Sequence, residues 1–134
     1  MKQRGLYMGI SLTSFAAMVL VACSGSSSTG VHAEHPSITK ARAVLDSIDY
    51  SGAANMPIEI NDKYPETYGW YENGVVYLTS IWIEDYKTNR YAPCTIVHEY
   101  AHHLQAETEY GTKWRDIAEI QADQAESRCV EALA

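Results

Sequence analysis

The sequence predicts an α+β fold, in which a small twisted sheet of about three strands packs against helices. Residues 57–79 contain short runs of alternating apolar and polar side chains separated by turn residues, which is typical of strands. Residues 37–48 and 93–106 instead repeat apolar side chains every three or four positions, as helices with one buried face do. Even if an N-terminal targeting segment is subtracted, the 134-residue chain is long enough for one domain with one modest core.

Residues 1–22 are predicted to be a targeting segment rather than part of the fold. Lys2 and Arg4 precede a mostly apolar stretch that ends in the letters LVAC at Cys23. This pattern resembles the signal peptide of a bacterial lipoprotein, and the resemblance implies cleavage before Cys23 and lipid attachment to that residue. The protein would then be anchored on the extracytoplasmic side of the cell envelope, at the outer membrane if the host is Gram-negative. The alternative is a transmembrane anchor, for which the apolar run is short.

Residues 23–36 are predicted to be a flexible tether, because they include the run SGSSSTG. The remaining residues, 37–134, form the expected domain. Its first helix is predicted at residues 37–48, where apolar side chains recur at helical spacing, and residues 49–56 are expected to be a connector. The apolar side chains of that helix are Ile38, Ala41, Val44, Leu45 and Ile48.

Three strands are expected between residues 57 and 79. The first is predicted at residues 57–61, PIEIN, which alternate in polarity. Residues 67–72 and 75–79 flank the pair Asn73 and Gly74, whose tolerance of positive φ favours a tight hairpin. Residues 80–90 are ambiguous, since they could extend the strand or begin a short helix.

Residues 93–106 are predicted to form a helix that contains the letters HEYAH. Residues four apart lie on the same face of a helix, so His98 and His102 can direct ring nitrogens at one metal ion. Glu99 lies about 100° further round, which suits contact with a water bound to that metal. Apolar side chains at roughly helical spacing, those of Ile96, Val97, Tyr100, Ala101 and Leu104, predict that the helix is largely buried.

A second constellation lies in a helix predicted from residue 112 to about residue 131, with Thr112 as its N-cap. Glu119 can be a third metal ligand, and Asp123, one turn later, can accept the remaining N–H of His98. These pairings require the two helices to run antiparallel. A solvated acidic helix face is the alternative. The side chains expected to face inward include Ile117, Ile120 and Ala122.

The letters HEYAH and EIQAD, at residues 98–102 and 119–123, together resemble the gluzincins, the thermolysin-like class of zinc metallopeptidases. The resemblance implies a small zincin-like domain that binds one Zn²⁺ through two histidines and a glutamate, here His98, His102 and Glu119. Glu99 would be the general base for a zinc-activated water that hydrolyses a peptide bond. Asp123 would support His98.

The resemblance also implies a peptide or protein substrate, bound as an added strand at an edge strand before the HExxH helix. Residues 75–79 are the candidate for that strand. The chain has no histidine after Glu119, so the residue that stabilises the transition state is unassigned, and Tyr77 or Tyr110 could reach the site. His103 is expected to pack or to support a ligand rather than to bind the metal.

Two other functions remain open at this point. The protein could be a non-catalytic zinc-binding or partner-binding lipoprotein, or a zinc amidase that acts on a cell-wall amide. Nucleic acid is not expected as a partner, because 17 acidic residues against 10 Lys and Arg give a formal net charge of −7 and no basic stripe.

With Cys23 assigned to the lipid, two cysteines remain in a chain exported to a compartment where disulfides persist. In the antiparallel register, one turn outward from His98 reaches Cys94, opposite about residue 127. Cys129 is within reach of that point, so a Cys94–Cys129 disulfide is predicted. Two unrelated buried thiols are the alternative.

Overall fold

The computed structural model describes residues 33–106 and 115–134. The predicted signal peptide, Cys23 and the first part of the tether therefore lie outside the described residues, as do Tyr110 and Thr112. The elements below all belong to one unit, Glu34–Ala134. None of the helices in the described ranges is both long enough and apolar enough to cross a membrane.

The sheet has three strands, β1 (Ile58–Ile60), β2 (Gly69–Glu72) and β3 (Val75–Leu78), arranged in the order β1-β3-β2. β2 and β3 are antiparallel, and Asn73 and Gly74 between them have φ values of 50° and 82°, which confirms the predicted hairpin. β1 is parallel to β3. The α+β class and the small sheet are thus confirmed.

The position of β3 corrects one expectation. Residues 75–79 were expected to be an edge strand that adds a substrate strand, but β3 is the central strand and is paired with β1 on one side and β2 on the other. Its backbone groups are already used on both sides, so it cannot receive another strand. Within the described sheet, the two edges are β1 and β2.

Five helices are described: α1 (Pro36–Ser47), α2 (Ser51–Ala54), α3 (Ser80–Tyr86), α4 (Cys94–Ala106) and α6 (Arg115–Leu133). For the ambiguous residues 80–90, the structure shows a short helix, α3, rather than a longer strand. The side chain of Thr79 caps this helix, because it accepts a hydrogen bond of 3.4 Å from the backbone N–H of Trp82. The short α2 lies within the expected connector.

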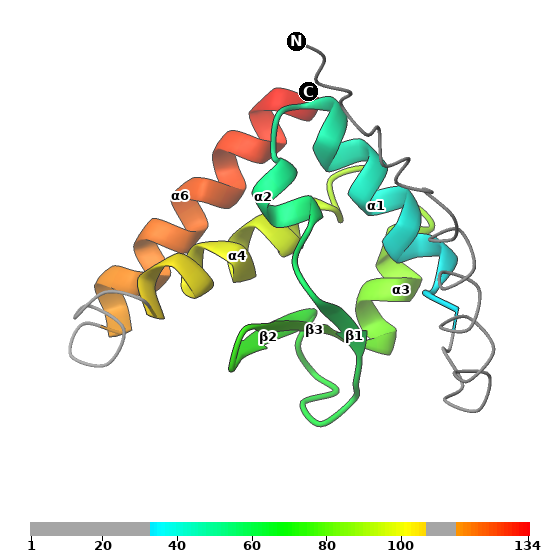
Figure 1. Cartoon of the computed structure of the whole chain (residues 1–134), viewed down its shortest axis with the longest axis horizontal. Coiled ribbons are helices and arrows are strands. Elements are labelled where there is room, and N and C mark those ends of the chain that lie inside the picture. Colours follow the sequence, from blue (N-terminus) through cyan, green and yellow to red (C-terminus); the bar gives the residue numbers. More distant parts are fainter. Residues whose placement is uncertain (1–32, 107–114) are drawn as a thin grey trace, which may run out of the picture. The chain divides into compact units, whose positions relative to one another are not determined.

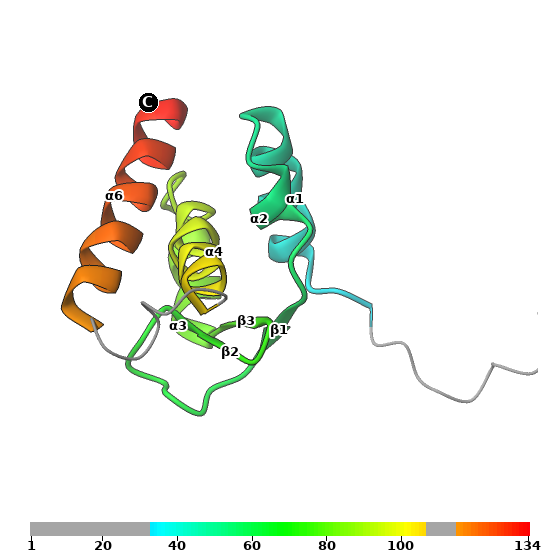
Figure 2. The ribbon, with the colours of Figure 1, turned by 60° about the vertical axis from the view of Figure 1, so that its left-hand side comes forward.

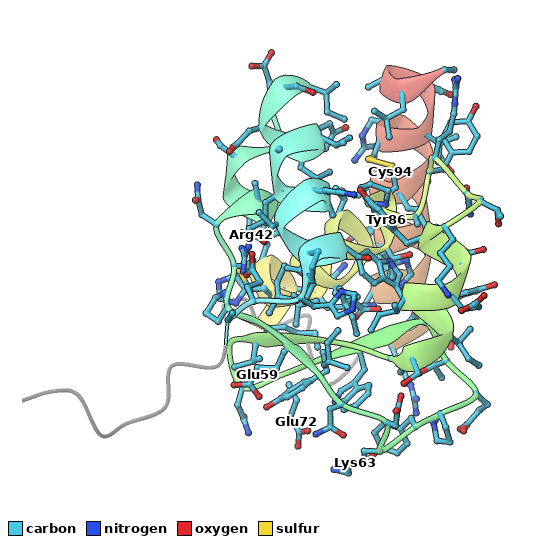
Figure 3. All side chains as sticks on the ribbon, turned by 90° about the vertical axis from the view of Figure 1, so that its right-hand side faces the viewer. Arg42, Glu59, Lys63, Glu72, Tyr86 and Cys94 are labelled. Atoms are coloured by element: carbon cyan, nitrogen blue, oxygen red, sulfur yellow. A yellow bond between two sulfur atoms is a disulfide. The ribbon has the colours of Figure 1, made fainter. Side chains whose placement is uncertain are left out.

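α4 lies over one face of the sheet, between α6 and the pair α1 and α2 (Figure 2). The close approach of α2 is possible because residue 52 is glycine: a Cβ there would collide with the hydroxyl of Tyr100 on α4. On the other face of the sheet, Glu59, Lys63 and Glu72 point away from the helices (Figure 3). The buried core accordingly fills the space between the sheet and the helices. Its largest members are Trp82, Ile38, Leu45, Leu78, Ile96 and Val76.

The face that α6 turns toward α4 differs from the prediction. Ile117 and Ile120 are 43% and 56% exposed, whereas Ala118, Ala122 and Cys129 are buried. Ala122 was correctly expected to face inward, but the two isoleucines were not. The reason is that α6 packs through its small side chains, which let the two helices approach closely, and this rotates the larger apolar residues outward. On α4, Leu104 is likewise 48% exposed.

Candidate metal centre

Helix α4 places His98 and His102 one turn apart on its side toward α6. Their Nε2 atoms lie 3.2 Å apart. Glu119 on α6 completes the group, with one carboxylate oxygen 3.2 Å from Nε2 of His102 and the other 3.4 Å from Nε2 of His98. The three residues predicted as ligands are therefore brought together, in a cluster that could hold a metal ion.

The ring of His98 is held from its far side by carboxylates. Its Nδ1 lies 3.1 Å from Oε2 of Glu126, with which it forms a hydrogen bond, and 3.3 Å from Oδ1 of Asp123. An ionised carboxylate only accepts hydrogen bonds, so Nδ1 must carry the proton. In the neutral ring, Nε2 then has the electron pair that a metal ligand needs.

Glu126 is the functional candidate that the sequence prediction missed. Asp123 was expected as the partner of His98 and does lie beside it, but Glu126 makes the hydrogen bond. The signal was present in the sequence, because Glu119, Asp123 and Glu126 recur at helical spacing and share one face of α6.

His102 is held by a different kind of partner. Its Nδ1 lies 2.9 Å from Oε1 of Gln105, a residue only 8% exposed. The amide nitrogen of Gln105 donates to the backbone oxygen of Ala118 at 2.9 Å and to Oε1 of Gln121 at 3.2 Å. Gln105 thus connects α4 to the first turn of α6.

Glu99 is buried, with 7% of its surface exposed. Burial raises the pKa of Glu99 to about 7, the charge of His98 opposes the rise, and the carboxylates of Glu119 and Glu126 add to it. The pKa of His98 is also raised, chiefly by its hydrogen bond to Glu126 and against the effect of burial. A carboxyl group with a pKa near neutrality can both take and return a proton.

The predicted disulfide is confirmed. Cys94 and Cys129 are bonded, with Cα atoms 5.6 Å apart, and Figure 3 shows the bond where α4 meets α6. Both residues are fully buried. The bond joins the start of the helix that carries both histidines to the last turns of the helix that carries Glu119.

Two further side chains that the sequence suggested for the site, those of Tyr77 and His103, lie elsewhere. Tyr77 alternates with the buried Val76 and Leu78 along β3, so it projects from the sheet face opposite α4, where its ring stacks on Trp70 at 4.9 Å. It cannot donate to a group at the centre. His103 projects toward the sheet and forms a hydrogen bond of 3.0 Å with the hydroxyl of Tyr71, consistent with the expected packing role.

In comparisons with known proteins, no protein-family model, no curated protein and no solved structure matches the chain. What the described residues show is an α+β domain in which α4 and α6 gather imidazole and carboxylate groups. These groups could bind a metal ion.

Proposed function

We propose that this protein is a lipid-anchored zinc metallopeptidase of the gluzincin kind, which hydrolyses peptide bonds with Glu99 as the general base. One observation carries the proposal: two imidazole nitrogens and a carboxylate converge, and the other nitrogen of each ring faces a side-chain oxygen. Electron pairs facing one another at 3.2 Å repel unless a proton or a cation lies between them. A bound cation would remove this repulsion between the two histidines and would also attract the carboxylate of Glu119.

Zinc suits this ligand set. In a tetrahedral site with ligands at about 2.0–2.1 Å, neighbouring ligand atoms lie about 3.3 Å apart. In the cluster, the two Nε2 atoms are 3.2 Å apart, and Glu119 faces each ring with a different oxygen, Oε1 at 3.2 Å from Nε2 of His102 and Oε2 at 3.4 Å from Nε2 of His98. Three protein ligands leave a fourth position for water or substrate, as catalytic sites do. Zinc supplies a water with a lowered pKa and a Lewis acid for the substrate carbonyl.

Glu99 is assigned the proton transfers. It follows His98 directly, so its side chain leaves α4 about 100° from that ligand. Its pKa of about 7 lets the carboxylate accept the proton of the attacking water and then donate it to the leaving amine. A purely structural metal site would not require a buried carboxyl group with this property.

With β3 excluded, β2 is the proposed substrate-binding edge. It packs against α4 and has β3 on one side only. Glu72 and Val75 flank the two-residue turn and so form a hydrogen-bonded pair, and the alternation of an antiparallel ladder then leaves the backbone groups of Tyr71 and Gly69 facing outward. An extended peptide could pair with these groups.

The variant Glu99→Gln tests the proposed function. It should bind zinc like the wild type but fail to cleave any member of a broad peptide library that the wild type cleaves. A parallel assay on cell-wall fragments distinguishes a peptidase from an amidase, since both would depend on Glu99. A wild-type protein that binds zinc and cleaves neither kind of amide would support a non-catalytic role instead.

A further inference from the structure

Gln105 occupies the point where the last turns of α4 meet the first turns of α6. It lies three residues after His102, and it is one of the few polar side chains buried among the described residues. Its amide group contacts a candidate metal ligand on one side and the backbone of the opposite helix on the other. A buried amide with partners on both sides is oriented by those partners.

The orientation of the amide follows from its partners. The backbone oxygen of Ala118 can only accept a hydrogen bond, so the group 2.9 Å from it must be the NH₂ of Gln105. The carbonyl oxygen of the amide therefore faces Nδ1 of His102 at 2.9 Å. An oxygen in that place requires a proton on Nδ1, so in the neutral ring the electron pair is on Nε2, the atom nearest His98 and Glu119.

The second hydrogen bond of the amide acts on the third candidate ligand. Ala118 immediately precedes Glu119, so a bond from Gln105 to the carbonyl of Ala118 holds the peptide group from which Glu119 extends. One side chain thus orients the ring of His102 and also holds the backbone that presents Glu119. On the opposite side of the site, the corresponding ring, that of His98, is held by carboxylates of α6 itself.

We propose that Gln105 is a positioning residue of the metal centre, which sets the tautomer of His102 and the place of Glu119 relative to it. The inference rests on the proposed metal centre, but it does not depend on peptidase activity. Its competitor is a purely structural tie between α4 and α6. The two differ in what they change: a structural tie affects folding, whereas a positioning residue also affects metal affinity and the protonation of one ring nitrogen.

The first measurement uses the metal-free wild-type full chain. Correlation NMR spectra of the histidine rings, assigned with His102→Gln, report which nitrogen of the neutral His102 ring is protonated. Protonation at Nδ1 is expected, and protonation at Nε2 would overturn the proposal. This measurement needs no variant of Gln105, so a folding defect cannot prevent the test.

The second measurement is zinc affinity, from competition with a chromophoric chelator. Gln105→Met keeps the length of the side chain but removes the hydrogen bonds of its amide, and it should weaken zinc binding about 10- to 100-fold. Gln105→Glu keeps an oxygen for Nδ1 and should bind zinc at least about fivefold more tightly than Gln105→Met. Gln121→Met removes only the outer contact of the amide and should stay within about twofold of the wild type.

The outcomes separate the inference from the function on which it rests. A folded Gln105→Met variant with wild-type zinc affinity would show that Gln105 is only a structural tie. If the wild type itself binds no zinc, the proposed metal centre fails and with it the role of Gln105 in that centre, while the NMR spectra still report whether His102 has the tautomer that the Gln105 contact requires. Weakened affinity in Gln105→Met, partial recovery in Gln105→Glu and no loss in Gln121→Met would establish the proposal.

Discussion

Reduction of the Cys94–Cys129 bond should remove a large part of the stability of this domain. The bonded residues are 35 apart in sequence, and closing a loop of that length lowers the entropy of the unfolded chain by about 13 cal/mol/K, or about 4 kcal/mol at 25 °C. Small domains have total free energies of unfolding of about 5–15 kcal/mol. The melting temperature should therefore fall by roughly 20 °C.

The assay is urea unfolding followed by circular dichroism, on oxidised protein and on protein refolded with reductant. Both cysteines are fully buried, so reduction needs prior unfolding. The double variant Cys94→Ala/Cys129→Ala should have the same free energy of unfolding as the reduced wild type, and reductant should not change it. Cys23→Ser should keep the full stability of the oxidised form. A difference below about 1 kcal/mol between the oxidised and reduced wild type would refute the reasoning.

Three further predictions concern the metal, the anchor and pH. His98→Ala, His102→Ala and Glu119→Ala should each abolish binding of one zinc per chain, and full occupancy by metal analysis in Glu119→Ala would remove the third ligand from the assignment. Cys23→Ser should lose lipid modification, so its partitioning into detergent should drop, and unchanged partitioning would contradict the anchor. The raised pKa of Glu99 predicts that metal-free protein loses stability as pH rises from 4.5 through about 7, because the folded state holds the proton more tightly than the unfolded state. The loss should be on the order of 3 kcal/mol larger in the wild type than in Glu99→Gln, which keeps only the contribution from the raised pKa of His98, as measured by urea unfolding with a chelator at about pH 5 and about pH 8, and equal pH profiles of the two proteins would refute it.

The candidate centre was largely predictable because helical periodicity is a local property of sequence. Residues 98 and 102 share a face of any α-helix, and an antiparallel partner that places Glu119 beside His102 must bring its later residues toward the start of α4. That geometry also predicted the disulfide between Cys94 and Cys129. The turn at Asn73 was predictable for a similar reason, since few residues adopt positive φ.

Features that depend on tertiary contacts were not predictable in this way. Nothing in residues 57–61 indicates that β1 pairs with β3 in parallel and so takes the edge that was expected to be open. The rotation of α6 about its own axis is likewise absent from the local pattern. That rotation decides that Ala118 faces α4 while Ile117 does not, and that Glu126 rather than Asp123 forms the hydrogen bond to His98.

The alanines along α6 have a consequence for the precision of the proposed metal centre. Alanine has no side-chain rotamers, so the spacing of α4 and α6 at Ala118 and Ala122 is set by backbone against side-chain surface and cannot drift as side chains reorient. For the same reason, the spacing of the two helices is sensitive to the size of the residues at these positions. Ala122 is fully buried, so a larger residue there is expected to push α6 away from α4 and to move Glu119 away from the histidines. Because plausible metal–ligand distances vary by only about 0.2 Å, such a movement of Glu119 is expected to weaken metal binding at the proposed centre.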